Sequence, residues 1–262
     1  MHERLNINTV ENFKNLYING CSFTAGHSLK KNDQFPFKLN ELLGTELFNF
    51  SKNGNSLETI AFTSIHHLQD FDPEDTLVVI GLTWSSRFGI LLNERMFNLT
   101  PADIRKGKAK TSFTDKNTYP RFSVPYVNVR NINIEEVQVE NQESVDEVLK
   151  QYRKYIETLI TYDDNVNSNF LGKYIYTLVN LENYLKLRKF NYLFIDYSGE
   201  AKFCRENYKL GSLLDQTRIV SMYKGLYNEF TIDPNTSHPT AEATTFLAEH
   251  IANIFNLNKV YE

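Results

Sequence analysis

The chain lacks any long hydrophobic run. No apolar stretch approaches the roughly 20 residues that a membrane-spanning helix needs. The opening segment MHERLNINTVENFKN has no apolar core of the kind found in a secretory signal. Cysteine is scarce too: Cys21 and Cys204 are the only 2, too few for a disulfide framework or a zinc site. We therefore expect a cytoplasmic protein in a reducing compartment, with no membrane partner.

An excess of charge of one sign is also missing. The net charge is -4, and acidic and basic residues are scattered along both halves of the chain. A dedicated nucleic-acid-binding protein would need a basic face, so we expect no nucleic-acid partner. We interpret the short basic cluster RKGKAK, at 105–110, as a solvated loop. Repeats, linkers and low-complexity segments are absent as well, which predicts one domain over 1–262.

What the chain does contain is an alternation of short apolar runs and helical periodicity. Strands are predicted at 15–20, 46–51, 76–83 and 191–198. Helices are predicted at 33–44, within 53–71, and at 144–160, 170–190 and 238–255. This order predicts an α/β fold with three layers, α/β/α, around a flavodoxin-like parallel sheet.

The alternation is interrupted in the middle of the chain. From about 93 to 141 the sequence mixes polar, proline and aromatic residues without a sustained period. We interpret this stretch as an insertion at the rim of the sheet, with a hairpin in FSVPYVNVRNINI at 122–134. The stretch 199–230 is also irregular, with short helical pieces.

Chemically distinctive loops follow three of the predicted strands. GCSFTAG (20–26) follows the first strand, NGNS (53–56) the second and GLTWSSR (81–87) the third, while DPNTSHPT (233–240) introduces the last helix. Sites in parallel α/β sheets form at the carboxyl ends of the strands. We therefore expect these four segments to lie together at one rim.

The segment GCSFTAG resembles the first sequence block of the SGNH or GDSL-type hydrolases. That block has the form G-D-S-x-x-x-G, and the match falls on Gly20, Ser22 and Gly26, with Cys21 replacing the usual acid. NFSKNGNSLETI is similar to the second block, and DPNTSHPTAEA to the C-terminal D-x-x-H block. The strand end VVIGLTWSSRF is similar to a divergent branch found among phage and bacterial surface-polysaccharide proteins, so a phage-encoded origin is one expectation.

The resemblance implies the SGNH hydrolase fold and a serine esterase without metal or organic cofactor. Ser22 is implied as the nucleophile, His238 as the base and Asp233 as the carboxylate that orients the imidazole. Asp233 lies five positions before His238, where the family has three, and Asn235 stands at the family's spacing. Which of the two meets the imidazole is left open, with Asp233 preferred because a carboxylate stabilises an imidazolium better.

The resemblance also implies an oxyanion hole made by the backbone N–H groups of Ser22 and Gly54. The family's third block, G-x-N-D, has an asparagine donor that GLTWSSR lacks. Either Thr83 or Asn55 substitutes for that asparagine, or the hole has backbone donors alone.

The expected reaction is ester hydrolysis through an acyl-serine intermediate. The substrate is expected to be an O-acylated carbohydrate or small molecule, since the insertion is rich in Tyr and Phe and aromatic faces stack on sugar rings. Trp84 and Arg87 are the candidate substrate-binding residues, with packing against the sheet as the alternative for Trp84. An O-acyltransferase with the same triad is an alternative, and a non-catalytic binding or structural module is another. The sequence does not indicate the oligomeric state.

Overall fold

The computed structural model describes residues 13–92, 95–99, 112–113, 126–128, 166–222 and 227–257. Within these ranges the centre is a 5-stranded sheet in the order β2-β1-β3-β8-β9, with every neighbouring pair parallel. The strands are β1 (Asn15–Asn19), β2 (Glu46–Asn49), β3 (Thr76–Gly81), β8 (Asn191–Asp196) and β9 (Ile219–Ser221). Counted within the sheet alone, this is the flavodoxin-like order, so the predicted fold class is confirmed.

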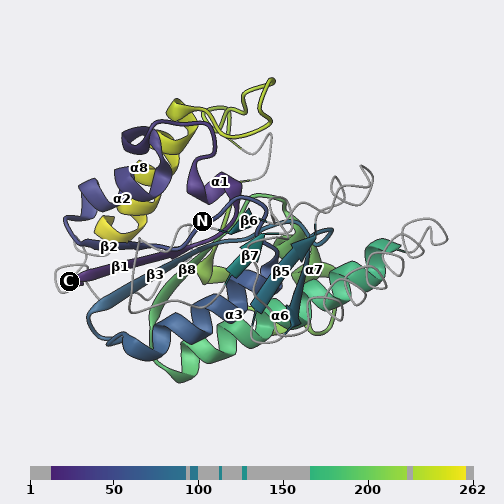
Figure 1. Ribbon diagram of the computed structural model, residues 1–262. Helices are drawn as coiled ribbons and strands as arrows, with labels where there is room; N and C mark the ends of the chain where they lie inside the picture. Colours follow the sequence, from purple (N-terminus) through teal and green to yellow (C-terminus); the bar gives the residue numbers. More distant parts are fainter. Residues whose placement is uncertain are drawn as a thin grey trace.

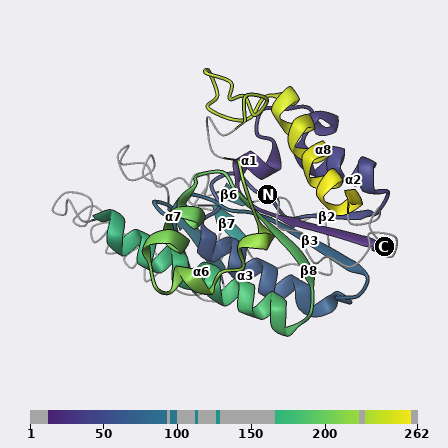
Figure 2. The same ribbon diagram turned by 180° about the vertical axis from the view of Figure 1, so that it is seen from behind.

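Helices cover both faces of this sheet (Figure 1). One face carries α2 (Phe35–Leu43) and α8 (Ala241–Leu257), and the other carries α3 (Leu57–His67) and α6 (Val166–Leu187). Seen from behind, α7 (Glu200–Asn207) lies beside α6 (Figure 2). No helix in the described part of the chain is both long enough and apolar enough to cross a membrane.

The two faces of the sheet have separate apolar cores. In β1, Leu16 and Ile18 pack with the core under α2 and α8, whereas Tyr17 packs with the core under α3 and α6. Successive side chains of a strand point to opposite faces, and here both faces are covered. This two-sided burial is why the strands are nearly continuous apolar runs in the sequence.

The strands begin where the sequence predicts and end one or two residues earlier. Predicted ends at 20, 51, 83 and 198 compare with observed ends at 19, 49, 81 and 196. Burial continues past the strand ends, for example at Leu82 and Tyr197, so apolar composition overstates strand length. Strand β9 was not predicted because its three residues are too few to show a period.

A second, small sheet is formed by β4 (Phe88–Leu92), β5 (Arg95–Leu99), β6 (Ser112–Phe113) and β7 (Tyr126–Asn128), in the order β4-β5-β7-β6. The antiparallel strands β4 and β5 lie on either side of the point at 93 where the sequence predicted the insertion to begin. Most of 93–141 lies outside the described residues, as does the predicted helix at 144–160. Of the predicted 122–134 hairpin, only β7 is described, and its partners are β5 and β6.

Candidate active site

The segment that follows β1 carries the first candidate residue. The short helix α1 (Ser22–Ala25) begins directly after β1, and Ser22 is buried, with 3% of its surface exposed. The helix ends at Gly26, whose φ of 67° is left-handed and whose N–H donates to the Ser22 carbonyl. A left-handed residue favours glycine, which gives Gly26 of the GCSFTAG segment a structural reason.

Two glycines allow the ends of β1 and β3 to approach Thr24 of α1. A Cβ atom would lie 2.2 Å from Thr24 Oγ1 if built on Gly20, and 1.8 Å if built on Gly81. Thr24 is fully buried between the two strand ends. Close packing against Thr24 therefore requires both glycines, and it fixes α1 at the carboxyl edge of the sheet.

The loop after β2 covers the end of β1. Asn55 Nδ2 donates to the Gly20 carbonyl over 2.9 Å, and Lys52 N–H donates to the same oxygen over 3.1 Å. Gly54, between these contacts, has a left-handed φ of 81°. The segment with Gly54 and Asn55 is thereby brought beside the residue pair Gly20 and Cys21 that precedes Ser22. The amide nitrogen of Asn55 already has a partner in the backbone, and its Oδ1 has none among the described residues.

The loop after β3 places an aromatic side chain against α1. Trp84 packs edge-on against Phe23, with ring centroids 4.8 Å apart. The Arg87 guanidinium lies 5.1 Å from the centre of the Trp84 ring, and its Nη1 donates to the Asn55 carbonyl over 3.4 Å. Thr83 is fully buried, and its hydroxyl has no hydrogen-bond partner among the residues that the structure describes.

His238 comes to this rim from the other end of the chain. Its ring centroid lies 5.4 Å from that of Phe23, the residue after Ser22, and 4.7 Å from that of His27. The loop that carries it is closed by a bridge between Ile232 and Pro239. The structure therefore brings the first and last of the distinctive segments together, as the sequence predicted for one rim.

A backbone carbonyl determines which nitrogen of His238 carries a proton. His238 Nδ1 lies 2.6 Å from the Thr236 carbonyl oxygen. A carbonyl oxygen only accepts, so Nδ1–H must be the donor in this contact. In the neutral ring Nε2 is then the unprotonated nitrogen, which is the form that a general base requires.

Asp233 makes its described hydrogen bonds within the same loop. Its Oδ1 accepts from the Asn235 N–H over 2.9 Å, and its Oδ2 accepts from Thr236 Oγ1 over 3.0 Å. These hydrogen bonds lower the pKa of Asp233, with the Asn235 N–H as the largest cause. Asp233 thus holds Asn235 and Thr236, and through Thr236 the carbonyl that meets His238.

Two further residues at the rim were not predicted from the sequence. His27 follows Gly26 directly, and its Nδ1 lies 2.6 Å from Asn53 Nδ2. Glu200, the first residue of α7, accepts hydrogen bonds from Ser85 of the loop after β3. The sequence offered one signal that these residues lie at the rim: His27 follows the GCSFTAG motif, and Glu200 closely follows the predicted strand at 191–198. Their partners lie far away in the sequence, which no local pattern reveals.

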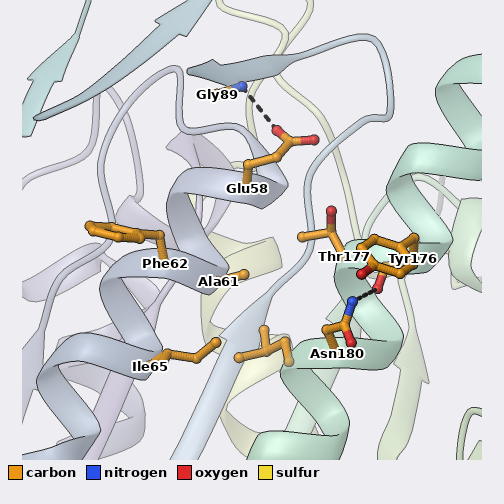
Figure 3. Close-up of a pocket in the computed structure, with 9 residues that line it drawn as sticks. Glu58, Ala61, Phe62, Ile65, Gly89, Tyr176, Thr177 and Asn180 are labelled. Carbon is orange, nitrogen blue, oxygen red and sulfur yellow. Dashed lines mark hydrogen bonds between the residues drawn. The ribbon is translucent and has the colours of Figure 1, made fainter. Parts of the chain in front are cut away.

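A hollow of about 320 Å³ lies elsewhere, between α3 and α6 (Figure 3). Its polar side chains are engaged locally: Glu58 accepts from the Gly89 N–H, and Asn180 donates to the Tyr176 carbonyl. None of the predicted site residues lines it. Over the described ranges, no group of three or more histidines, cysteines or acids is arranged to hold a metal ion, and Cys21 and Cys204 are free thiols.

Comparison with known proteins gives structural similarities only. No protein-family model and no curated protein matches the chain. Similar solved structures include a lipolytic G-D-S-L family protein from Veillonella parvula DSM 2008, at 9% identity and a TM-score of 0.48, covering 92% of this chain and 98% of that one. The esterase EstA from Pseudoalteromonas sp. is 10% identical, with a TM-score of 0.48 and coverage of 94% and 99%. A family 3 carbohydrate esterase from Clostridium thermocellum is 9% identical, with a TM-score of 0.42 and coverage of 95% and 100%.

Proposed function

We propose that the protein is a serine ester hydrolase that works through an acyl-serine intermediate. The observation that carries the proposal is the state of His238: its Nδ1 faces the Thr236 carbonyl at 2.6 Å, which leaves Nε2 as a base. Its ring also lies against Phe23, the residue next to Ser22. A serine hydroxyl becomes an effective nucleophile when a neighbouring imidazole takes its proton.

In the proposed reaction, Ser22 Oγ forms a bond to the ester carbonyl carbon while His238 Nε2 takes the serine proton. The carbonyl π bond moves its electron pair to oxygen, and the N–H groups of Ser22 and Gly54 donate to that oxyanion. Collapse of the tetrahedral intermediate breaks the bond to the alcohol oxygen, which receives the proton from His238. Water then attacks the acyl-serine by the same steps, releasing the acid and restoring Ser22.

Asp233 acts indirectly in this scheme, through the loop that carries His238. The hydrogen bonds that it accepts from Asn235 and Thr236 stabilise the loop whose carbonyl orients His238. The negative charge of Asp233 also favours the imidazolium that forms during the reaction.

The proposed substrate is an O-acylated carbohydrate or another small ester. Trp84, packed against Phe23 and covered by the Arg87 guanidinium, supplies an aromatic surface and hydrogen-bond donors at the rim. Rings of this kind stack on apolar sugar faces, and a guanidinium pairs with hydroxyl or carboxylate oxygens.

The wild-type protein should react with a fluorophosphonate probe and hydrolyse 4-nitrophenyl acetate with burst kinetics, because both reagents report an activated serine. The measurement is probe labelling followed by mass mapping, with heat-denatured protein as the control. Labelling on Ser22 is the expected result. Wild-type protein that is folded, unlabelled and inactive would contradict the proposed function.

Thr83 allows a test of the third oxyanion donor, which we assign to its hydroxyl. Thr83→Val should lower kcat by about 100-fold, the usual cost of losing one oxyanion donor. The free energy of unfolding should stay the same or rise by about 1 kcal/mol, because a buried hydroxyl without a partner is removed. Kinetics with 4-nitrophenyl acetate and urea denaturation measure the two effects.

Thr63→Val is the matched control for this substitution. Thr63 is also buried, but its hydroxyl donates to the Thr59 carbonyl over 2.7 Å and accepts from Asn19 Nδ2 over 2.8 Å. The control should therefore lose stability and keep its kcat. A Thr83→Val protein with unchanged kcat would assign the oxyanion hole to the backbone donors.

A further inference from the structure

Glu200 contacts the loop after β3 with both of its carboxylate oxygens. The Ser85 N–H donates to Oε2 over 2.7 Å, and Ser85 Oγ donates to Oε1 over 2.9 Å. The two residues are 115 positions apart in the sequence. The contact therefore ties the start of α7 to residues 82–87, the segment that we call the 82–87 loop. Hydrogen bonds to both oxygens of one carboxylate fix the orientation of Ser85 relative to Glu200, which a single hydrogen bond would not do.

Glu200 is itself fixed to the end of β8. Its N–H donates to Ser198 Oγ over 3.2 Å, and Ser198 Oγ lies 3.2 Å from Asp196 Oδ1. Asp196 is fully buried and also accepts from the N–H groups of Gly199 and Lys202. The carboxylate that holds Ser85 is thus part of a network built on a central strand, which makes it a rigid reference point.

Burial and hydrogen bonding act in opposite directions on the Glu200 carboxyl. The pKa of Glu200 is raised, with burial as the largest cause and the Asp196 charge acting in the same direction, while both hydrogen bonds from Ser85 oppose this rise. Donors that lower a carboxyl pKa bind the ionised form more strongly than the neutral form. Each bond from Ser85 to Glu200 is therefore stronger than a bond between neutral groups.

The 82–87 loop carries the residues that face α1. Trp84, immediately before Ser85, packs on Phe23 at 4.8 Å, and Phe23 follows Ser22. Two residues after Ser85, Arg87 reaches the Asn55 carbonyl. We propose that Glu200 is a positioning residue of the active site: it holds Ser85, so that Trp84 and Arg87 stay against the loops that carry Ser22 and Gly54. The part of this inference that concerns activity rests on the proposed function.

The chain has a single tryptophan, Trp84, so its fluorescence reports on this loop alone. In Glu200→Ala, Ser85 N–H and Oγ lose their acceptors, and the loop should leave Phe23. We expect emission from Trp84 to shift to longer wavelength, and acrylamide quenching to increase about twofold or more. We also expect kcat/KM for 4-nitrophenyl acetate to fall by at least about tenfold, because small displacements of positioning groups are costly.

Glu200→Gln is the conservative rescue. Its carbonyl accepts from the Ser85 N–H, and its amide donates to Ser85 Oγ, so it should recover most of the quenching protection and activity. Glu206→Ala is the matched control, because Glu206 lies on the same helix and is exposed. It should behave as wild type in both measurements.

A folded Glu200→Ala protein with wild-type emission, quenching and kcat/KM would overturn the inference. If Glu200→Ala does not fold, Glu200→Asp replaces it under the same criteria, because the shorter side chain withdraws the oxygens and keeps the charge. If the wild-type protein has no esterase activity, the proposed function fails. The fluorescence of these variants then still decides whether Glu200 holds the loop.

Discussion

Ser22→Ala should lower kcat for ester hydrolysis by about 1000-fold or more and abolish labelling by the fluorophosphonate probe. Ser22 stands at the first position of α1, buried beside the strand ends where the 82–87 loop and the Gly54 segment meet. Without Oγ no acyl-enzyme forms, and what is left is catalysis by water with the remaining binding groups. Steady-state kinetics and intact-protein mass measurement test the expectation.

Cys21→Ala is the sharpest control, because Cys21 is the adjacent side chain and a free thiol that is itself a possible nucleophile. Cys21 is fully buried, and the Cys21→Ala protein should keep both labelling and turnover. Loss of labelling in Cys21→Ala, with labelling retained in Ser22→Ala, would assign the nucleophile to the thiol and refute the proposed chemistry.

Much of the fold could be predicted because its signals are local. The runs at 76–83 and 191–198 are apolar throughout, since β3 and β8 are covered on both faces of the sheet. By contrast, β9 is defined by its pairing with β8, and a three-residue strand carries no period of its own. The β4–β5 hairpin was missed for a related reason, because it pairs within a separate small sheet and does not continue the alternation of strands and helices.

The candidate site also has a part that the sequence predicts and a part that it does not. Parallel strands share a carboxyl edge, so the sequence could predict that the loops with Ser22, Gly54 and Thr83 lie together. The orientation of His238 depends on a backbone carbonyl at Thr236 and on the left-handed φ of 57° at Ser237. A left-handed residue other than glycine has no clear signature in a single sequence, so the sequence alone points to side chains as partners of the imidazole.

The second large effect is expected at His238. His238→Ala should lower kcat by a factor similar to that of Ser22→Ala, and the double variant should be no worse than either, because the two residues act as one unit. His66→Ala is the control, since His66 is an exposed histidine on α3. Turnover of 4-nitrophenyl acetate measures all four proteins. Additive losses in the double variant would mean that His238 does not activate Ser22.

Asp233→Asn distinguishes two ways of orienting the His238 imidazole, by the Thr236 carbonyl or by the Asp233 carboxylate itself. In the variant the amide oxygen can still accept from the Asn235 N–H, the amide nitrogen can donate to Thr236 Oγ1, and the Thr236 carbonyl still faces His238 Nδ1. We therefore expect a loss of about tenfold, well below that of His238→Ala, as suits a residue that acts through the loop. A loss as large as that of His238→Ala would mean that the carboxylate itself meets the imidazole during the reaction. Asn235→Ala tests the residue that stands three positions before His238. It should have a smaller effect than Asp233→Asn, because Asn235 contributes its backbone N–H, which the variant keeps.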